Sequence, residues 1–280
     1  AMLREMGIPP FWPVEAGPVE VASAPDAQPV AAHVALPEHI QAAVSVSEQR
    51  VAAPVVPTST RAAPPRALAP AAAASADDQA RVPRPAGVEL MDWPALREAV
   101  GACQACALCD SRQQTVFGVG NIEADWMIVG EAPGEEEDRR GEPFVGKAGQ
   151  LLDRMLDALD LTRAEAPAAK QVFIANVLKC RPPANRNPLP TEVAQCEPYL
   201  LRQMALVKPK VIVAMGRFAA QSLLKSTDAI GRLRGKVHHV DGIPVVVTYH
   251  PAYLLRNPAD KSLVWDDLCL AREVRQQALP

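Results

Sequence analysis

The sequence predicts an α/β fold: a three-layer α/β/α domain with a central four-stranded parallel sheet, preceded by a disordered arm rich in proline and alanine. Two observations support this prediction. Short apolar runs alternate with amphipathic segments throughout residues 86–280, a pattern typical of parallel sheets covered by helices on both faces. Residues 1–85 instead contain 14 of the 28 prolines and 2 of the 15 glycines, and no helical or strand periodicity lasts there.

Four apolar runs of strand length predict the sheet. Glycine ends the first run at Gly130 and the third at Gly216. The predicted strands are 126–129, 172–177, 211–215 and 245–249. Segments between and around them place apolar residues at helical spacing. The predicted helices are 93–103, 148–161, 191–207, 217–224 and 263–277, with Thr191 as the N-cap of the third.

Charge and composition exclude several classes of protein. The chain carries 29 Lys and Arg against 32 Asp and Glu, which excludes binding of nucleic acid through bulk positive charge. No run of about 18 apolar residues is present, so we expect no membrane-spanning helix. The first residues lack the pattern of a secretion signal, so we expect a cytoplasmic protein. Residues 86–280 are expected to form one monomeric domain. The apolar residues 2–12 of the arm are either a sticky terminus or a docking peptide for a protein partner.

Unusual residues follow the predicted strands, at the edge where parallel sheets bind ligands. The first strand continues into GEAPGEEEDRRGEPFVGKAGQLL at 130–152, whose glycines expose backbone N–H groups but match neither a P-loop nor a dinucleotide pattern. Glu131 is expected to point into the crevice, whereas the acidic run after it is typical of a solvated face. Phe144 is either a core residue or a platform on which a base stacks.

Two further strand ends carry candidate binding residues. Asn176 either ties down a neighbouring loop or reads an amide-like edge, because its side chain offers a donor beside an acceptor. His250 begins HPAYLLR at 250–256 and has either a structural or a functional role. Leu255 and Arg256, in the same segment, suit a wedge pushed into a base stack.

The cysteines indicate a metal site. Cys103, Cys106 and Cys109 are spaced by two residues each, and Cys180 and Cys196 follow from distant segments. Their spacing supports zinc and an iron–sulfur cluster equally.

The region from about Cys103 to Val274 resembles the family 4 uracil-DNA glycosylases, the iron–sulfur branch of the uracil-DNA glycosylase superfamily. The resemblance rests on five motifs in the same order: VFGVGN at 116–121, GEAPGEEED at 130–138, GEPFVGKAGQLL at 141–152, NVLKCRPPANRNPLP at 176–190 and HPAYLLR at 250–256. It implies an enzyme of the bacterial nucleoid that flips uracil out of DNA and hydrolyses its N-glycosidic bond, leaving an abasic site for base excision repair.

The resemblance also implies roles for individual residues. A 4Fe-4S cluster is expected on Cys103, Cys106, Cys180 and Cys196, with Cys109 as an extra thiol. The substrate-binding residues would be Gly130, Ala132, Gly134, Phe144 and Asn176, with Phe144 stacked on uracil and Asn176 reading its edge. His250 would hydrogen-bond uracil O2. Because Ala132 stands where the best-known branch has Asp, Glu131 is the first candidate for activating water and Glu137 the second.

The expected chemistry fits these residues. Uracil leaves as an anion with charge on O2 and O4, so the pocket needs donors aimed at O2. Two basic clusters are expected to contact phosphates: Lys179, Arg181 and Arg186, and Arg232, Arg234 and Lys236. Two other interpretations stay open. In the first, the protein is a glycosylase for other deaminated bases, such as hypoxanthine or xanthine. In the second, it is a non-catalytic module that binds DNA or a polymerase.

Overall fold

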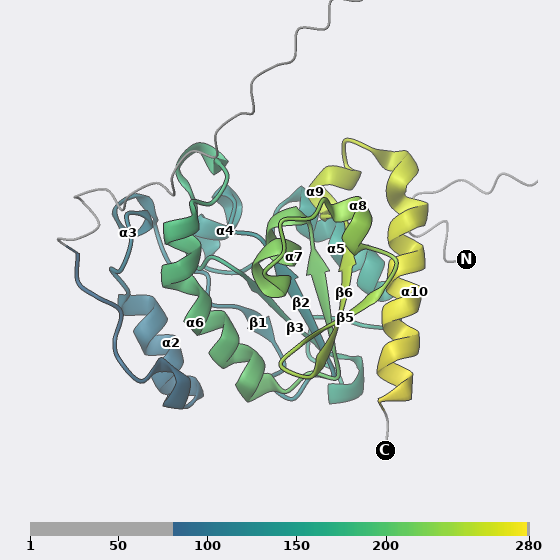
Figure 1. Cartoon of the computed structure of the whole chain (residues 1–280), viewed down its shortest axis with the longest axis horizontal. Coiled ribbons are helices and arrows are strands. Elements are labelled where there is room, and N and C mark those ends of the chain that lie inside the picture. Colours follow the sequence, from purple (N-terminus) through teal and green to yellow (C-terminus); the bar gives the residue numbers. More distant parts are fainter. Residues whose placement is uncertain (1–80, 279–280) are drawn as a thin grey trace, which may run out of the picture. The chain divides into compact units, whose positions relative to one another are not determined.

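A six-stranded sheet lies at the centre of the described part of the chain, residues 81–278 of a computed structural model (Figure 1). The strand order is β1-β3-β2-β4-β6-β5. The four inner strands are parallel to one another. They are β2 (Trp126–Gly130), β3 (Val172–Asn176), β4 (Val211–Met215) and β6 (Ile243–Thr248). Every residue of β2, β3 and β4 is buried, which is why these strands are continuous apolar runs in the sequence.

The α/β class is confirmed, but the predicted number of four strands was wrong. The two additional strands, β1 (Val119–Gly120) and β5 (Val237–Val240), pair antiparallel at the two edges of the sheet. β1 has two residues, too few to show a periodicity. β5 is half exposed and contains two histidines, so it has no apolar run. Its hairpin partner β6 follows after Asp241–Gly242, both with positive φ, and this Asp-Gly pair is the sequence signal that the prediction overlooked.

Helices cover both faces of the sheet. On one face, α5 (Lys147–Asp157), α9 (Pro251–Leu254) and α10 (Lys261–Gln277) pack against Trp126, Ile128 and their neighbours. On the other face, α6 (Pro190–Val207), α7 (Arg217–Leu224) and α8 (Ile230–Leu233) pack against Met127, Val129 and the residues around them. Alternate strand residues thus enter opposite cores, as a pleated strand requires.

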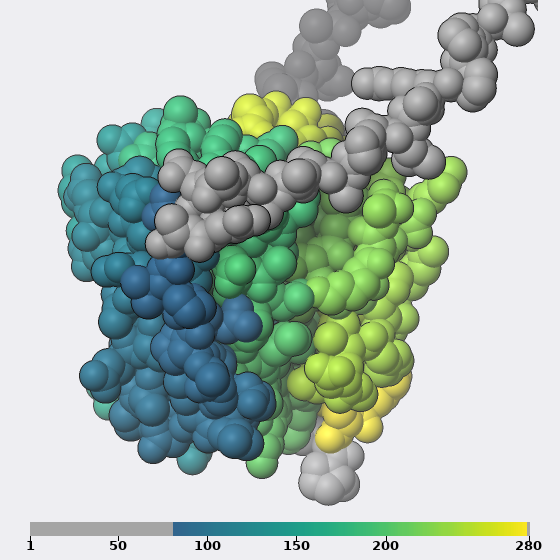
Figure 2. All heavy atoms as spheres, turned by 60° about the vertical axis from the view of Figure 1, so that its left-hand side comes forward, coloured from purple at the N-terminus to yellow at the C-terminus, as the bar shows by residue number. Residues whose placement is uncertain are grey.

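The segment before the sheet forms a smaller cluster against α6. It contains α2 (Trp93–Ala102) and α3 (Leu108–Ser111), and Leu96 and Val100 of α2 pack with Phe117 and Tyr199. Figure 2 shows this blue segment lying along the green one that carries α6. The short helix α4 (Glu135–Arg140) follows β2 directly.

The five predicted helices are present: α7 has the predicted bounds, and the other four have shifted ends. The predicted cap at Thr191 was wrong: α6 starts at Pro190, and the Glu192 carboxylate accepts a hydrogen bond from the N–H of Leu189 at 2.8 Å. The helix predicted over 148–161 ends at Asp157. Among residues 81–278, no helix is both long and apolar enough to cross a membrane. The arm predicted for residues 1–85 lies outside the described residues, apart from its last five.

Candidate active site

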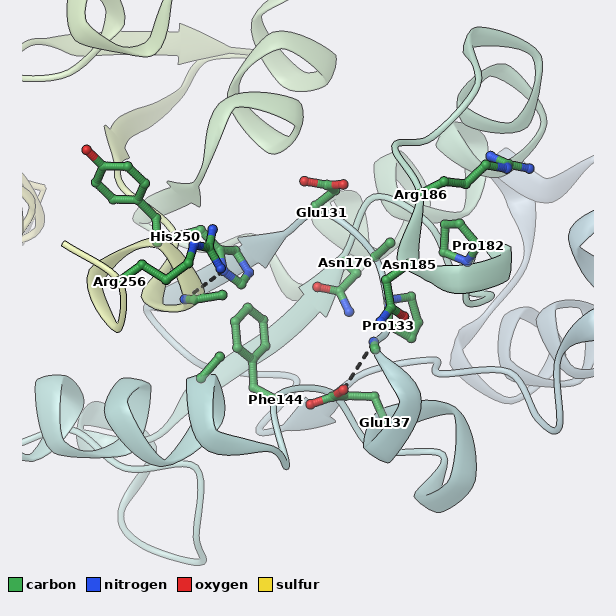
Figure 3. Close-up of a pocket in the computed structure, with 15 residues that line it drawn as sticks. Glu131, Pro133, Glu137, Phe144, Asn176, Pro182, Asn185, Arg186, His250 and Arg256 are labelled. Carbon is green, nitrogen blue, oxygen red and sulfur yellow. Dashed lines mark hydrogen bonds between the residues drawn. The ribbon is translucent and has the colours of Figure 1, made fainter.

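One pocket of about 460 Å³ opens beyond the carboxyl ends of β2, β3 and β6. Figure 3 shows its side chains coming from the end of β3, from the segments that follow these strands, including the helix that carries Glu137, and from the turn before α5. The lining residues are Glu131, Ala132, Pro133, Gly134, Glu137, Phe144, Ala148, Asn176, Pro182, Asn185, Arg186, His250, Ala252, Tyr253 and Arg256. The pocket therefore brings together the catalytic and substrate-binding residues predicted from the sequence, except Gly130, which lies behind Asn176 and Phe144.

The floor of the pocket depends on a glycine. Gly130 pairs with Asn176 across β2 and β3. A Cβ on Gly130 would lie 2.3 Å from Asn176 Oδ1 and 2.7 Å from Phe144 Cζ. Only glycine lets the amide and the ring come this close to the end of β2.

The amide of Asn176 is prepared for a ligand. The residue is 2 % exposed, and its Oδ1 has no hydrogen-bond partner among the described residues. A buried polar atom without a partner costs about 1–3 kcal/mol, so such atoms are rare unless a ligand completes them. The alternative that Asn176 ties down a neighbouring loop through Oδ1 therefore finds no support.

Phe144 is held in a strained turn next to His250. Its φ is 55°, a left-handed conformation that is uncommon for a residue with a side chain. A Cβ on Gly149 of α5 would lie 1.7 Å from the Phe144 carbonyl oxygen, so the helix approaches this turn only through a glycine. The rings of Phe144 and His250 stack at 5.3 Å between centroids and 24° between planes. Phe144 is 5 % exposed, so it is both a buried residue and part of the pocket wall.

His250 is held in a neutral form. It is the N-cap of α9, and its Nδ1 accepts a hydrogen bond from the N–H of Ala252 at 3.1 Å. Burial lowers the pKa of His250 to about 4, although Glu137 opposes this shift. With Nδ1 acting as an acceptor, the single proton of the neutral ring sits on Nε2. The pocket thus contains an uncharged N–H donor.

Glu131 follows β2 directly, as the sequence predicts, but its carboxylate points away from Asn176 and Phe144 (Figure 3). It also borders a neighbouring groove beside Phe218 and Gln221 of α7. Burial raises the pKa of Glu131 to about 7, and the charge of Arg217 partly offsets that rise. A carboxyl group with such a pKa can hold or release a proton near neutral pH.

Glu137 organises the loop. Its Oε2 accepts a hydrogen bond from the N–H of Gly134 at 3.1 Å. Its Oε1 accepts from Val145 at 2.9 Å and from Gly146 at 3.0 Å. One carboxylate therefore joins the turn before α4 to the turn before α5, directly after Phe144.

The predicted wedge lies at the rim. Leu255 is 47 % exposed, and Arg256 lines the pocket mouth. The segment is held by Tyr253, whose ring stacks on Tyr249 at 4.8 Å and whose hydroxyl donates to Asp260 at 2.6 Å. The exposed leucine is therefore presented by a rigid turn.

One predicted phosphate contact was wrong. Lys179 is 2 % exposed and its Nζ donates to Asn176 O and to Gln203 Oε1, so it cannot reach DNA. In the other cluster, Arg234 forms a buried ion pair with Asp267, while Arg232 and Lys236 are exposed. The prediction grouped Lys179 with Arg181 and Arg186 by charge alone, although its neighbours Leu178 and Cys180 are buried.

Five thiols line a second, small cavity: Cys103, Cys106, Cys109, Cys180 and Cys196. Arg112 Nη1 donates to Cys180 Sγ at 3.2 Å, and the backbone N–H of Lys179 donates to Cys196 Sγ at 3.2 Å. Burial raises the pKa of Cys106 to about 11 and that of Cys196 to about 12 in the absence of a metal. Among residues 81–278, no three ligand side chains are arranged to hold a single metal ion.

Sequence reasoning missed several residues around the pocket. Asn185 is one of them, and it lines the pocket from the loop after β3, where Ala184 and Asn185 both have positive φ. Arg186, which the sequence predicts as a phosphate contact, lines the pocket beside it. The buried Glu192 holds this loop through two hydrogen bonds to the Arg186 guanidinium. The Pro-Pro-Ala-Asn-Arg run was a signal for a tight turn, but its place at the pocket depends on tertiary packing.

Comparison with known proteins agrees with this geometry. Residues 117–269 match the family model of the Uracil DNA glycosylase superfamily. The chain is 46 % identical to a Type-4 uracil-DNA glycosylase of Archaeoglobus fulgidus over 165 residues, 56 % of this chain and 80 % of that protein. It is 41 % identical to the Type-4 uracil-DNA glycosylase of Thermotoga maritima over 184 residues, 64 % and 92 % of the two chains. A Type-5 uracil-DNA glycosylase of Pyrobaculum aerophilum is 33 % identical over 146 residues, 48 % of this chain and 64 % of that protein. The chain belongs to the uracil-DNA glycosylase superfamily, in its type-4 family.

Proposed function

We propose that this protein is a DNA-repair hydrolase that removes uracil from DNA and leaves an abasic site. One observation carries the proposal: the unpartnered Oδ1 of Asn176, the ring of Phe144 and the neutral His250 meet in one pocket at the edge of the sheet. An amide acceptor, an aromatic ring and an uncharged donor are the groups that a flipped pyrimidine requires.

Asn176 reads the base. Its Oδ1 accepts the N3–H of uracil, and its amide N–H group donates to O4. Cytosine has no N3–H and carries an amino group in place of O4, so it would leave the buried Oδ1 unpartnered. Losing a hydrogen bond to a buried polar group costs about 1–3 kcal/mol.

His250 stabilises the leaving group. The bond to the sugar breaks as negative charge develops on uracil, and a neutral imidazole with its proton on Nε2 donates toward O2 without giving that proton up. Because burial holds the pKa of His250 near 4, this donor keeps the same form throughout the neutral range.

Glu131 activates water in this proposal. Its pKa of about 7 makes it able to accept a proton at neutral pH, and its carboxylate charge favours a positive sugar carbon. The hydrogen bonds of Glu137 to three backbone N–H groups support a positioning role for that residue instead. Leu255 and Arg256 act as the wedge that fills the space left by the extruded base.

The thiol cavity fits a 4Fe-4S cluster held by Cys103, Cys106, Cys180 and Cys196. The thiols share one buried cavity without closing around a single ion, and a cluster takes one thiolate for each iron. When bound, the cluster would be a structural crosslink between the α2–α3 segment and the loop after β3 that lines the active pocket. Cys109 remains an additional thiol in contact with Asp110. We also propose a monomeric, cytoplasmic enzyme whose residues 1–85 are dispensable for catalysis.

A direct test uses oligonucleotides that each contain one uracil, hypoxanthine or xanthine, followed by alkali cleavage of abasic sites. The account predicts cleavage of the uracil strand only, and its loss in Asn176→Ala protein. Preferential cleavage at hypoxanthine or xanthine would show a glycosylase for other deaminated bases. Binding of uracil-DNA without any abasic product would show a non-catalytic module.

A further inference from the structure

Lys179 is a buried cation that the proposed reaction does not use. Its side chain is 2 % exposed, and it lies between the Asn176 end of β3 and Cys180. No ion pair to Lys179 occurs among residues 81–278, although a buried ammonium normally needs a compensating charge. Lys179 lines the same cavity as Cys180 and Cys196, and its backbone N–H donates to Cys196 Sγ at 3.2 Å.

The ammonium joins three segments through hydrogen bonds. Lys179 Nζ donates to the carbonyl oxygen of Asn176 at 2.8 Å and to Gln203 Oε1 at 2.6 Å. Gln203 is itself fully buried, and its Nε2 donates to the carbonyl oxygen of Phe117 at 2.9 Å. These bonds connect the end of β3 to α6 and to the loop before β1.

The position of the base-reading amide depends on this support. Within residues 81–278, Asn176 Oδ1 accepts no hydrogen bond, so no bond to this atom fixes the side chain before a ligand binds. Its direction is set by the backbone at the end of β3, and Lys179 holds the carbonyl of that same residue. The next residue along the chain from Lys179 is Cys180, a thiol of the second cavity.

We propose that Lys179 is a positioning residue that couples the cluster-binding thiols to the uracil-reading amide. Its positive charge balances the thiolates of Cys180 and Cys196, and its hydrogen bonds fix the end of β3 that presents Asn176. This inference rests on the proposed function and on the proposed cluster. It predicts that removal of the charge changes the electrostatics of the cluster and the speed of base excision together.

The test compares the iron-loaded wild-type enzyme with iron-loaded Lys179→Met, in which a neutral side chain of similar length replaces the ammonium. The midpoint potential of the cluster, measured by EPR-monitored titration, is expected to fall, because loss of a nearby positive charge makes reduction less favourable. The single-turnover rate of uracil release is expected to fall about tenfold or more, as it does when a residue that orients a functional side chain through a hydrogen bond is replaced. The matched control is Lys208→Met, an exposed lysine at the end of α6, and it should change neither value.

An unchanged potential in iron-loaded Lys179→Met would overturn the charge-balancing role, and an unchanged rate would overturn the positioning role. If Lys179→Met does not fold, Gln203→Met is measured instead. This variant removes one hydrogen-bond acceptor of Lys179 Nζ and keeps the charge of Lys179. It should slow uracil release without shifting the potential, and a wild-type rate would again overturn the positioning role. Failure of the wild-type enzyme to release uracil would instead refute the proposed function, while the comparison of potentials still tests the charge of Lys179.

Discussion

Replacement of Gly130 by alanine tests whether the pocket floor needs a glycine. The added Cβ would lie 2.3 Å from Asn176 Oδ1, whereas ordinary contact begins at 3.4 Å. The amide must therefore move by about 1.1 Å, the difference between these two distances. A displacement of about 1 Å in a catalytic site costs about 100-fold in rate, equivalent to about 2.7 kcal/mol of transition-state stabilisation.

The assay is uracil release from a labelled oligonucleotide under single-turnover conditions with enzyme in excess. Gly101→Ala is the matched control: it lies in α2, its Cβ would meet nothing within 4 Å, and it should keep the wild-type rate. Overpacking is expected to lower the free energy of unfolding of Gly130→Ala by about 1–3 kcal/mol, so folding is checked by thermal denaturation. A folded Gly130→Ala protein with a rate within threefold of wild type would refute the reasoning.

Five further predictions concern the pocket, the thiols and the arm. His250→Ala should slow single-turnover excision far more than it weakens DNA binding, because the ring acts on charge that develops only as the bond breaks. Since burial lowers the pKa of His250 from 6.5 to about 4, the folded state binds fewer protons than the unfolded state between these values, and stability should fall as the pH drops through that window. Burial raises the pKa of Glu131 from 4.5 to about 7, so excision should increase as the pH rises through about 7, and Glu131→Gln should abolish this increase. Purified protein should be brown with iron bound, Cys103→Ser should lose iron and Cys109→Ser should retain it. Deletion of residues 1–85 should leave cleavage of a uracil oligonucleotide nearly intact.

Each of these predictions has a contradicting result. An unchanged excision rate in His250→Ala would refute the role of His250 at uracil O2. If wild type and His250→Asn lost the same free energy of unfolding in acid, the buried neutral imidazole would be refuted. A pH profile of Glu131→Gln that follows wild type would assign water activation to another group. A colourless protein with stoichiometric zinc would show a zinc site in place of the cluster. Loss of iron in Cys109→Ser would show that Cys109 is a ligand. Loss of cleavage on deletion of residues 1–85 would show that the arm is required for catalysis.

The buried strands were predictable because they are apolar on both faces. β2, β3 and β4 were expected close to their observed bounds. The pocket lies at the carboxyl ends of two of these strands, β2 and β3, and of β6. The edge strands were not expected, because β1 has only the two residues Val119 and Gly120 and β5 is half exposed with two histidines. Neither segment carries much hydrophobic signal. Pairing with a neighbour already in the sheet, not local propensity, makes those segments strands.

The pocket residues were found by their place after the strands, but their partners were not. Sequence showed Glu137 in an acidic run, and only the fold brings its carboxylate to the N–H groups of Val145 and Gly146. Likewise, Lys179 belongs to a basic motif, yet the side chain turns inward to Gln203, 24 residues away. Such contacts join distant segments through tertiary packing, and no local pattern encodes them.

The central claim is that this pocket receives an extruded uracil and reads it with Asn176. The most direct measurement is a crystal structure of the protein with uracil at saturating concentration. The account predicts uracil beside the ring of Phe144, with its N3–H and O4 hydrogen-bonded to the Asn176 amide and O2 facing His250. A pocket that stays empty, or uracil bound away from Asn176, would contradict it.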